Sequence, residues 1–166
     1  MKHLFLVLSF VCFLAVQVSA QSTVQSTAPS TAPSTSSPNN DAEKEAVKNV
    51  IKQTFKAMLA ADTVLLKSCF APGAIMHVVQ NQKDSVVVRT SKVADFVASI
   101  GKQQPGSLDE RSFDEIIYID RELASAWAPY TFHRNGQFSH KGIDSFQFVK
   151  LKEGWKIQYL IYNMYQ

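Results

Sequence analysis

The sequence contains very little cysteine and no Asn-x-Ser/Thr glycosylation signal. Its two cysteines are Cys12 and Cys69, and Cys12 lies in an apolar N-terminal segment that we expect to be removed from the mature chain. The mature chain then has no pair of cysteines for an intramolecular disulfide, so an exported domain of this size has to rely on its apolar core. Cys69 lies in the apolar segment LLKSCF, which favours a buried thiol over an exposed nucleophile.

An excess of charge of one sign is also missing. The 17 Lys and Arg residues stand against 14 Asp and Glu residues, which gives a net charge of +3. A nucleic-acid-binding protein usually carries a clustered basic surface, so we expect no nucleic acid as partner. The sequence has no phosphate-binding loop, no dinucleotide fingerprint and no zinc-ligand spacing, and we therefore expect no metal and no cofactor.

Residues 1–20 have the features of a secretory signal peptide. A short basic start precedes the apolar run LFLVLSFVCFLAV, and Val18-Ser19-Ala20 matches a small-residue cleavage site. The apolar run is too short for a stable membrane-spanning helix. We therefore expect a secreted or periplasmic protein after cleavage near Ala20, with no attachment to a membrane.

Residues 21–40 are of low complexity and include the repeat STAPSTAPST. A Ser, Thr and Pro-rich segment has almost nothing to bury and cannot offset its own ordering entropy, so it is predicted to be a disordered linker. The remaining residues, 41–166, have the length of one domain.

The first half of this domain is predicted to be mainly helical. Asn40 and Glu43 have the spacing of a capping box, and apolar residues follow at helical spacing between residues 47 and 58. Asp62 is expected to cap a second, shorter helix, which Pro72-Gly73 would end.

Two short strands and a third helix are expected next. Residues 74–80 and 85–89 have the composition of strands on either side of a polar turn. A helix is predicted between Ser91, as its cap, and Gly101, as its end. The Gly, Pro and Gln residues that follow indicate a loop.

The last third of the chain is dominated by aromatic residues and strand patterns. Of the 18 aromatic residues, 12 lie between Glu110 and Gln166. The segment is predicted to form four consecutive strands, at 113–120, 123–133, 138–151 and 155–165. Asn135-Gly136 is the strongest hairpin signal, because both residues tolerate the positive φ of a type I′ turn. Helices followed by a long antiparallel run predict an α+β fold with the helices on one face of the sheet.

This order of elements resembles the nuclear transport factor 2-like superfamily. The resemblance covers residues 42–166 and rests on AVKNVIKQTFKAMLAADTVLLKSCFAPGAIM and GIDSFQFVKLKEGWKIQYLIY. It is most similar to the SnoaL-like and "putative lumazine-binding" branch. The resemblance implies a cone-shaped roll, in which a curved antiparallel sheet packs against three N-terminal-half helices, with a pocket at its mouth and often a homodimer. It does not imply a single reaction, because the fold hosts enzymes and binding modules.

A face for the pocket follows from the hairpin register. With a two-residue loop, residue 134 pairs with 137, so Trp127 opposes Asp144 and Thr131 opposes His140. Alternation then places these four residues and Phe146 on one face, an apolar wall with a few polar groups that is typical of a small-molecule pocket.

Two further residues are candidates for binding. Pro129 cannot donate to the strand ladder, and a bulge there would bring Tyr130 to the pocket face. His77 lies in an apolar strand and is a second candidate, although a lone histidine in such a strand is more often a satisfied structural residue.

Asp144 is the candidate catalytic group. If it is desolvated among aromatic residues, its pKa rises toward the range of a general base, and His140 or a tyrosine can polarise a carbonyl. The structural alternative is that Asp144 is hydrogen-bonded to His140 or to the indole N–H of Trp127.

Three functions follow as alternatives. The first is an exported domain that binds a small molecule in an aromatic-lined pocket. The second is an isomerase, dehydratase or cyclase-like enzyme that uses Asp144 and His140 for proton transfer. The third is a dimerisation or interaction module that uses an apolar surface of Val149, Leu160, Tyr162 and Met164.

Overall fold

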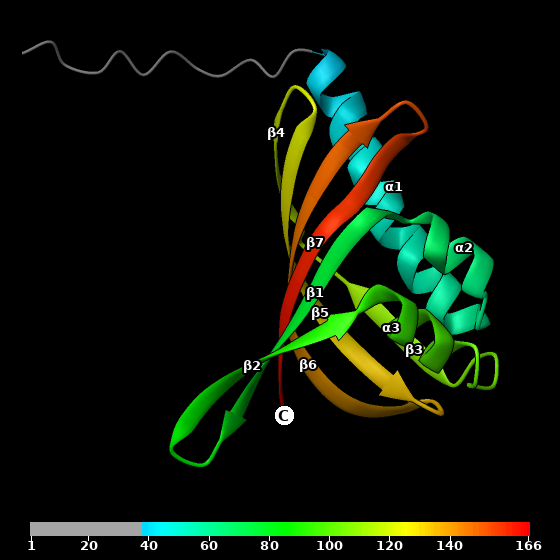
Figure 1. Ribbon diagram of the computed structural model, residues 1–166, viewed down its shortest axis with the longest axis vertical. Coiled ribbons are helices and arrows are strands. Elements are labelled where there is room, and N and C mark those ends of the chain that lie inside the picture. The colour runs from blue at the N-terminus through cyan, green and yellow to red at the C-terminus, as the bar shows by residue number, and fades with distance from the viewer. Residues whose placement is uncertain (1–37) are drawn as a thin grey trace, which may run out of the picture. The chain divides into compact units, whose positions relative to one another are not determined.

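The computed structural model describes residues 38–166. These residues form three helices and seven strands (Figure 1), which run in chain order as α1 (Pro38–Ala60), α2 (Thr63–Ser68), β1 (Phe70–Gln82), β2 (Ser85–Lys92), α3 (Val93–Ile100), β3 (Leu108–Ser112), β4 (Ile116–Asp120), β5 (Leu123–Arg134), β6 (Gln137–Leu151) and β7 (Gly154–Tyr165). The predicted signal peptide and the predicted linker up to residue 37 lie outside the described residues.

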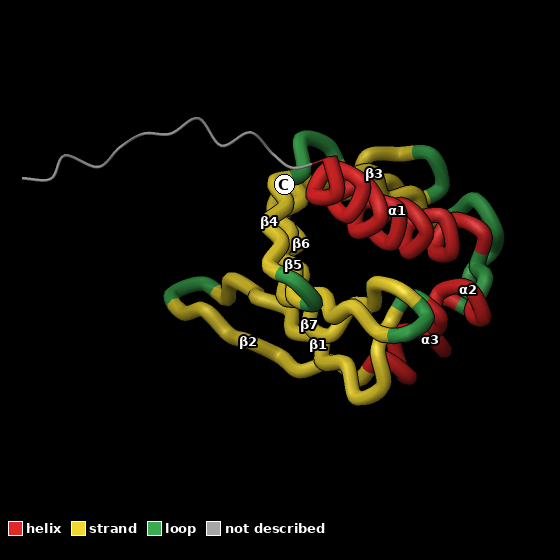
Figure 2. The backbone as a smooth tube through the Cα atoms, turned by 90° about the horizontal axis from the view of Figure 1, so that it is seen from above, coloured by secondary structure: helices red, strands yellow, loops and turns green. Residues whose placement is uncertain are grey.

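The strands form one curved, open sheet with the order β2-β1-β7-β6-β5-β3. The strand β4 pairs with the first half of β5, and β3 pairs with its second half. Neighbouring strands are antiparallel except for β1 and β7, which are parallel. Figures 1 and 2 show the three helices on one side of the sheet. The predicted α+β class is therefore confirmed, and the parallel pair is the one departure from an all-antiparallel sheet.

One of the two predicted N-terminal helix caps is confirmed, and the other is wrong. The carboxylate of Asp62 accepts hydrogen bonds from the backbone N–H groups of Val64 and Leu65, at 3.0 and 2.9 Å, so the predicted cap of α2 is confirmed. The predicted capping box of α1 is wrong. The helix begins at Pro38, whose fixed φ suits the first helical position, and Glu43 instead accepts hydrogen bonds from Lys150 and Trp155.

Two other predicted boundaries are corrected. The helix α2 ends at Ser68, and Pro72-Gly73 lies inside β1, where the pairing with β7 is irregular. The helix α3 has Lys92 rather than Ser91 at its N-cap and has no side-chain cap, whereas Gly101 ends it as predicted.

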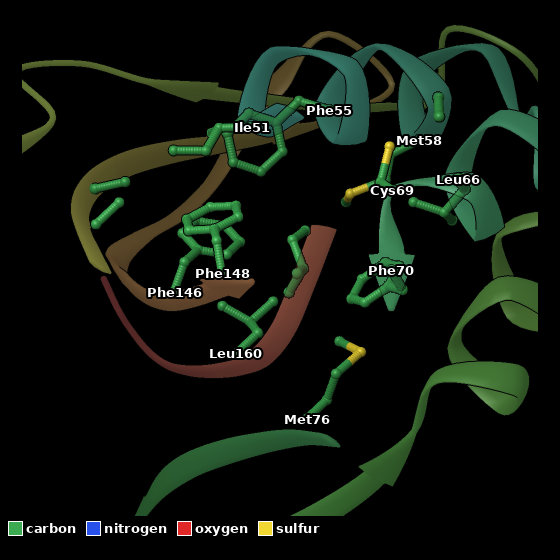
Figure 3. Close-up of a cluster of buried hydrophobic side chains, with 14 of the residues drawn as sticks. Ile51, Phe55, Met58, Leu66, Cys69, Phe70, Met76, Phe146, Phe148 and Leu160 are labelled. Atoms are coloured by element: carbon green, nitrogen blue, oxygen red, sulfur yellow. The ribbon is translucent and has the colours of Figure 1, made fainter. Parts of the chain in front are cut away.

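The core lies between α1 and the inner face of the sheet. Ile51 and Phe55 of α1 point toward Phe146 and Phe148 of β6 (Figure 3), whose rings stack with centroids 5.5 Å apart. The inner face of β5 begins with three buried alanines, Ala124, Ala126 and Ala128. These small side chains leave room for the large side chains of the neighbouring elements.

Candidate functional site

The hairpin between β5 and β6 contains a bulge that changes the predicted register. Asn135 and Gly136 both have positive φ, 51° and 77°, and the pairing of Arg134 with Gln137 confirms the predicted two-residue turn. The register then shifts between His133 and Phe132, because Ser139 is an extra residue on β6. Beyond this bulge every pair differs from the prediction by one residue.

The bulge moves two predicted site residues to the opposite face of the sheet. Trp127 pairs with Ser145 rather than Asp144, and Thr131 pairs with Lys141 rather than His140. Because a shift of one residue reverses the face of a side chain, Trp127 and Thr131 do not share a face with Asp144. Trp127 is 49% exposed on the face that carries no helix.

The same register brings Tyr130 onto the inner face. It pairs with Gly142, and the even-numbered residues of both strands beyond the bulge point toward the helices. The prediction attributed this placement to a bulge at Pro129, but Pro129 pairs regularly with Ile143 and the bulge is at Ser139. The proline is accommodated because its neighbour β3 ends at Ser112, and only its carbonyl is used, by Phe113 N–H.

His77 does not reach the inner face either. Its Nδ1 atom lies 2.9 Å from the Tyr159 hydroxyl oxygen, and its Nε2 atom lies 3.0 Å from Thr90 Oγ1. Both ring nitrogens have partners within the sheet, which is the arrangement of a structural histidine.

The inner face and the helices enclose a cavity of about 350 Å³. Four of the predicted residues line it: Tyr130, His140, Asp144 and Phe146. Most of its wall is apolar, with residues from α1, α3 and every strand except β2 and β4, including Phe55, Met58, Met76, Phe96, Ile100, Leu108 and Leu160. Its volume is within the range of about 300–1,000 Å³ that is usual for small-molecule sites.

A pair of acidic side chains lies at the polar part of this cavity. Asp144 is only 3% exposed, and Glu110 of β3 lines the same cavity with its carboxyl group next to that of Asp144. Burial raises the pKa of both groups, and the neighbouring carboxyl of Asp144 raises the pKa of Glu110 further. The predicted desolvation of Asp144 is therefore confirmed. Two neighbouring carboxyls of this kind titrate as a coupled pair, and burial favours their protonated forms.

The Oδ2 atom of Asp144 is buried and has no hydrogen-bond donor among residues 38–166. The predicted structural partners do not supply one, since Trp127 lies on the other face and the Nδ1 atom of His140 is paired with Ser139 Oγ at 3.1 Å. Glu110 can donate only when its carboxyl group is protonated. A buried acceptor without a donor is costly, so this oxygen atom distinguishes Asp144 from the apolar residues that line the rest of the cavity.

The ring of Tyr130 fits against β6 because its neighbour Gly142 has no side chain. Its ring lies over Gly142, and its hydroxyl donates to the backbone carbonyl of Asn163 at 2.9 Å. Burial, followed by the charges of Glu110 and Asp144, raises the pKa of Tyr130, so the hydroxyl stays protonated. The hydroxyl is committed to Asn163, and the ring serves as a wall of the cavity.

Tyr162 and His140 complete the polar edge. Tyr162 pairs with Asp144 across β6 and β7, and burial, with the charges of Glu110 and Asp144, raises its pKa. His140 stacks on Phe132 with centroids 4.8 Å apart. Burial and the charge of Arg134 lower the pKa of His140, so the imidazole is neutral at physiological pH. Arg134 lines the cavity but is exposed, which places it at the opening.

The predicted dimer surface does not exist as one exposed patch. Leu160 and Tyr162 line the cavity, and Leu160 is only 6% exposed. Val149 pairs with Leu123 on the outer face and is partly buried. Four exposed apolar side chains instead lie together on the helix-free face of β4 and β5: Ile116, Tyr118, Leu123 and Trp127.

Glu110 was missed from the sequence because its strand was missed. The segment LDERS reads as a continuation of the polar loop, with three charged residues in five. The available signal was alternation, since Leu108 and Glu110 share a face and Leu108 is buried.

A larger groove of about 820 Å³ lies between α2, α3 and the first residues of β1. Its charged residues, Lys67 and Lys92, are exposed, and no buried polar side chain lines it among the described residues. The smaller cavity is therefore the better candidate site. In the described part of the chain, no three His, Cys, Asp or Glu side chains are grouped as metal ligands. None of the helices in this part has the length and apolar character needed to span a membrane.

Comparisons with known proteins agree with this fold. A family model described as "putative lumazine-binding" matches residues 42–163. A search of curated proteins gives no match.

Many solved structures are similar to the chain. One is a nuclear transport factor 2-like protein of unknown function from Shewanella baltica, with 17% identity and a TM-score of 0.60 over 76% of this chain and 96% of that one. Another, described as a putative dehydratase of the same family from Streptomyces avermitilis, has 13% identity and a TM-score of 0.58 over 76% of this chain and 98% of that one. At these identities the likeness shows the fold alone.

Proposed function

Because the chain belongs to the "putative lumazine-binding" family of the nuclear transport factor 2-like superfamily, we propose that it binds a small organic molecule in the cavity between the helices and the sheet. The observation that carries this proposal is the orphaned acceptor Oδ2 of Asp144, buried inside an otherwise apolar cavity. A folded domain without a ligand would gain stability by replacing such a group, so its presence points to a bound partner.

The cavity suits a flat, mostly apolar molecule with one polar end. Phe146 and Leu160 supply apolar contact, and the rings of Tyr130 and Tyr162 flank the acidic pair. Aromatic walls of this kind contribute binding through buried area and ring stacking. The predicted export of the protein places this binding outside the cytoplasm, and a homodimer stays a prediction.

Ligand-observed NMR with toluene and indole tests the proposal. Ser99 of α3 lines the cavity and is exposed, so its side chain lies at the opening, and a Ser99→Trp substitution is expected to block entry. Lys102→Trp is the matched control, because Lys102 is exposed and lines neither the cavity nor the groove. Trp127→Ala should also leave binding unchanged. Binding that survives Ser99→Trp, or is absent in the wild type, would argue against the cavity as the site.

A second candidate function is proton transfer next to a carbonyl group. It is favoured by the carboxyl pair, because burial raises the pKa of both groups toward the range in which one carboxyl can accept a proton while the other donates a hydrogen bond. In this scheme Asp144 removes a proton from the carbon beside the carbonyl, and Glu110 stabilises the resulting enolate oxygen. His140, the partner predicted from sequence, lines the same cavity in its neutral form and can also donate an N–H.

Hydrogen–deuterium exchange of cyclohexanone tests this candidate by proton NMR. The wild type should accelerate exchange at the carbon beside the carbonyl, and Asp144→Asn should remove the acceleration. Glu122→Gln, which changes an exposed acidic residue, is the control. An exchange rate equal to that in buffer would leave binding as the better supported function.

A further inference from the structure

We propose that the cavity selects ligands with a basic nitrogen, which bind as cations against the Glu110–Asp144 pair. The proposal rests on the proposed binding function and adds the charge of the ligand. It follows from the distribution of charged groups around the cavity.

The acidic pair has no basic partner inside the cavity. Among the described side chains that line it, only His140 and Arg134 can be cations. His140 is neutral, and its Nδ1 atom is paired with Ser139. Arg134 is exposed at the opening, where solvent and salt screen its charge. When the pair is ionised, its negative charge has no cation beside it within the cavity, and an uncompensated charge at the buried Asp144 is costly unless a partner supplies the opposite charge.

A protonated nitrogen supplies both the hydrogen-bond donor and the positive charge that the acidic pair lacks. Its N–H group donates to the orphaned Oδ2 atom of Asp144, and a charge-assisted hydrogen bond of this kind is about twice as strong as a neutral one. Its positive charge balances the acidic pair. The rings of Tyr130, Tyr162 and Phe146 line the same space and favour a cation over their faces.

Ligands of other charge fit less well. A neutral amide can donate to Oδ2 but leaves the charge of the pair uncompensated. A carboxylate is repelled by the pair and is left with Arg134 at the opening, where an exposed ion pair contributes little.

Three probes of nearly the same shape separate these cases: benzamidine is a cation, benzamide is neutral and benzoate is an anion at neutral pH. Isothermal titration calorimetry measures the dissociation constant of each for the full mature chain. We expect benzamidine to bind at least tenfold more tightly than benzamide, and benzoate to bind most weakly.

The preference must depend on the pair. In the double variant Glu110→Gln and Asp144→Asn, benzamidine should lose its tenfold advantage over benzamide, whereas Glu122→Gln should retain it. Toluene binding to the double variant shows that its cavity is intact. Loss of toluene binding in the double variant would mean that the variant is disrupted, and the comparison of the three probes on the wild type then decides alone.

The other outcomes distinguish a wrong charge preference from a wrong binding function. Equal affinity for benzamidine and benzamide, or tightest binding of benzoate, would overturn the proposed charge preference and leave small-molecule binding in place. Failure of all three probes while toluene still binds would also overturn it. Failure of toluene and indole as well would overturn the proposed function itself.

Discussion

Replacing Gly142 by alanine tests whether the cavity wall is built as the structure shows. A Cβ atom at this position would lie 2.1 Å from the backbone carbonyl oxygen of Asn163 and 2.8 Å from both Cε1 and the hydroxyl oxygen of Tyr130. The first contact involves backbone and cannot be relieved by a rotation of a side chain. The Gly142→Ala variant must therefore separate β6 from β7 locally and displace the tyrosine.

The expected cost combines two effects. Forcing an extra carbon atom into a packed site typically costs about 1–3 kcal/mol. Loss of the hydrogen bond from Tyr130 to Asn163 adds about 1 kcal/mol. We therefore expect the free energy of unfolding to fall by about 2–4 kcal/mol, and the binding of toluene to weaken because the wall has moved.

Urea unfolding followed by circular dichroism measures this change. With a slope of about 2 kcal/mol per molar urea, the midpoint should fall by about 1–2 M. Tyr130→Phe is the control, because it removes only the hydroxyl and should cost about 1 kcal/mol. A Gly142→Ala variant whose stability lies within about 0.5 kcal/mol of the wild type would refute the close packing of Tyr130 over Gly142.

Three further predictions concern the acidic pair, a surface network and the bulge. Burial raises the folded-state pKa of Glu110 and Asp144 above their unfolded values of about 4. The stability that the pair contributes is therefore fully present below the unfolded pKa values and is lost as pH rises through the folded pKa values. In urea unfolding between pH 5 and pH 8, the double variant Glu110→Gln and Asp144→Asn should lose less stability than the wild type. Glu43→Gln replaces the carboxylate that accepts hydrogen bonds from Lys150 and the indole N–H of Trp155 by a neutral amide. The variant should have a lower urea midpoint and tryptophan emission at longer wavelength. Deletion of Ser139 should remove the bulge, keep the pairing of Phe132 with His140 and preserve ligand binding in the NMR assay, whereas a slipped register would abolish binding.

The features predicted correctly from sequence are those with a local cause. The cap at Asp62 depends on one side chain and the two N–H groups that follow it. The turn at Asn135-Gly136 depends on the φ angles of those two residues. The α+β order depends on patterns within single segments, and none of these needs knowledge of a distant residue.

The features predicted wrongly depend on tertiary structure. Glu43 has the spacing of a capping residue, but its carboxylate accepts a hydrogen bond from Trp155, which lies 112 residues away in the chain. The strand β3 has one buried apolar residue, Leu108, and it pairs with the edge of β5, so the sequence holds only a weak alternation signal for Glu110 and none for its neighbour Asp144. The bulge at Ser139 leaves no signature in FSHKG, because any residue can be the extra one.

The bulge decides more than the position of two side chains. If Ser139 were paired with a residue of β5 instead of bulging out, Trp127 would stand opposite Asp144, and its indole N–H could donate to the carboxylate. With the bulge, Asp144 stands opposite Ala128, whose methyl group cannot donate a hydrogen bond. The carboxyl is thereby left with Glu110, a second acid, as its neighbour and with one oxygen that has no donor among the described residues. A one-residue shift thus separates Asp144 from the indole N–H of Trp127 and leaves a buried acidic pair with one unpaired oxygen.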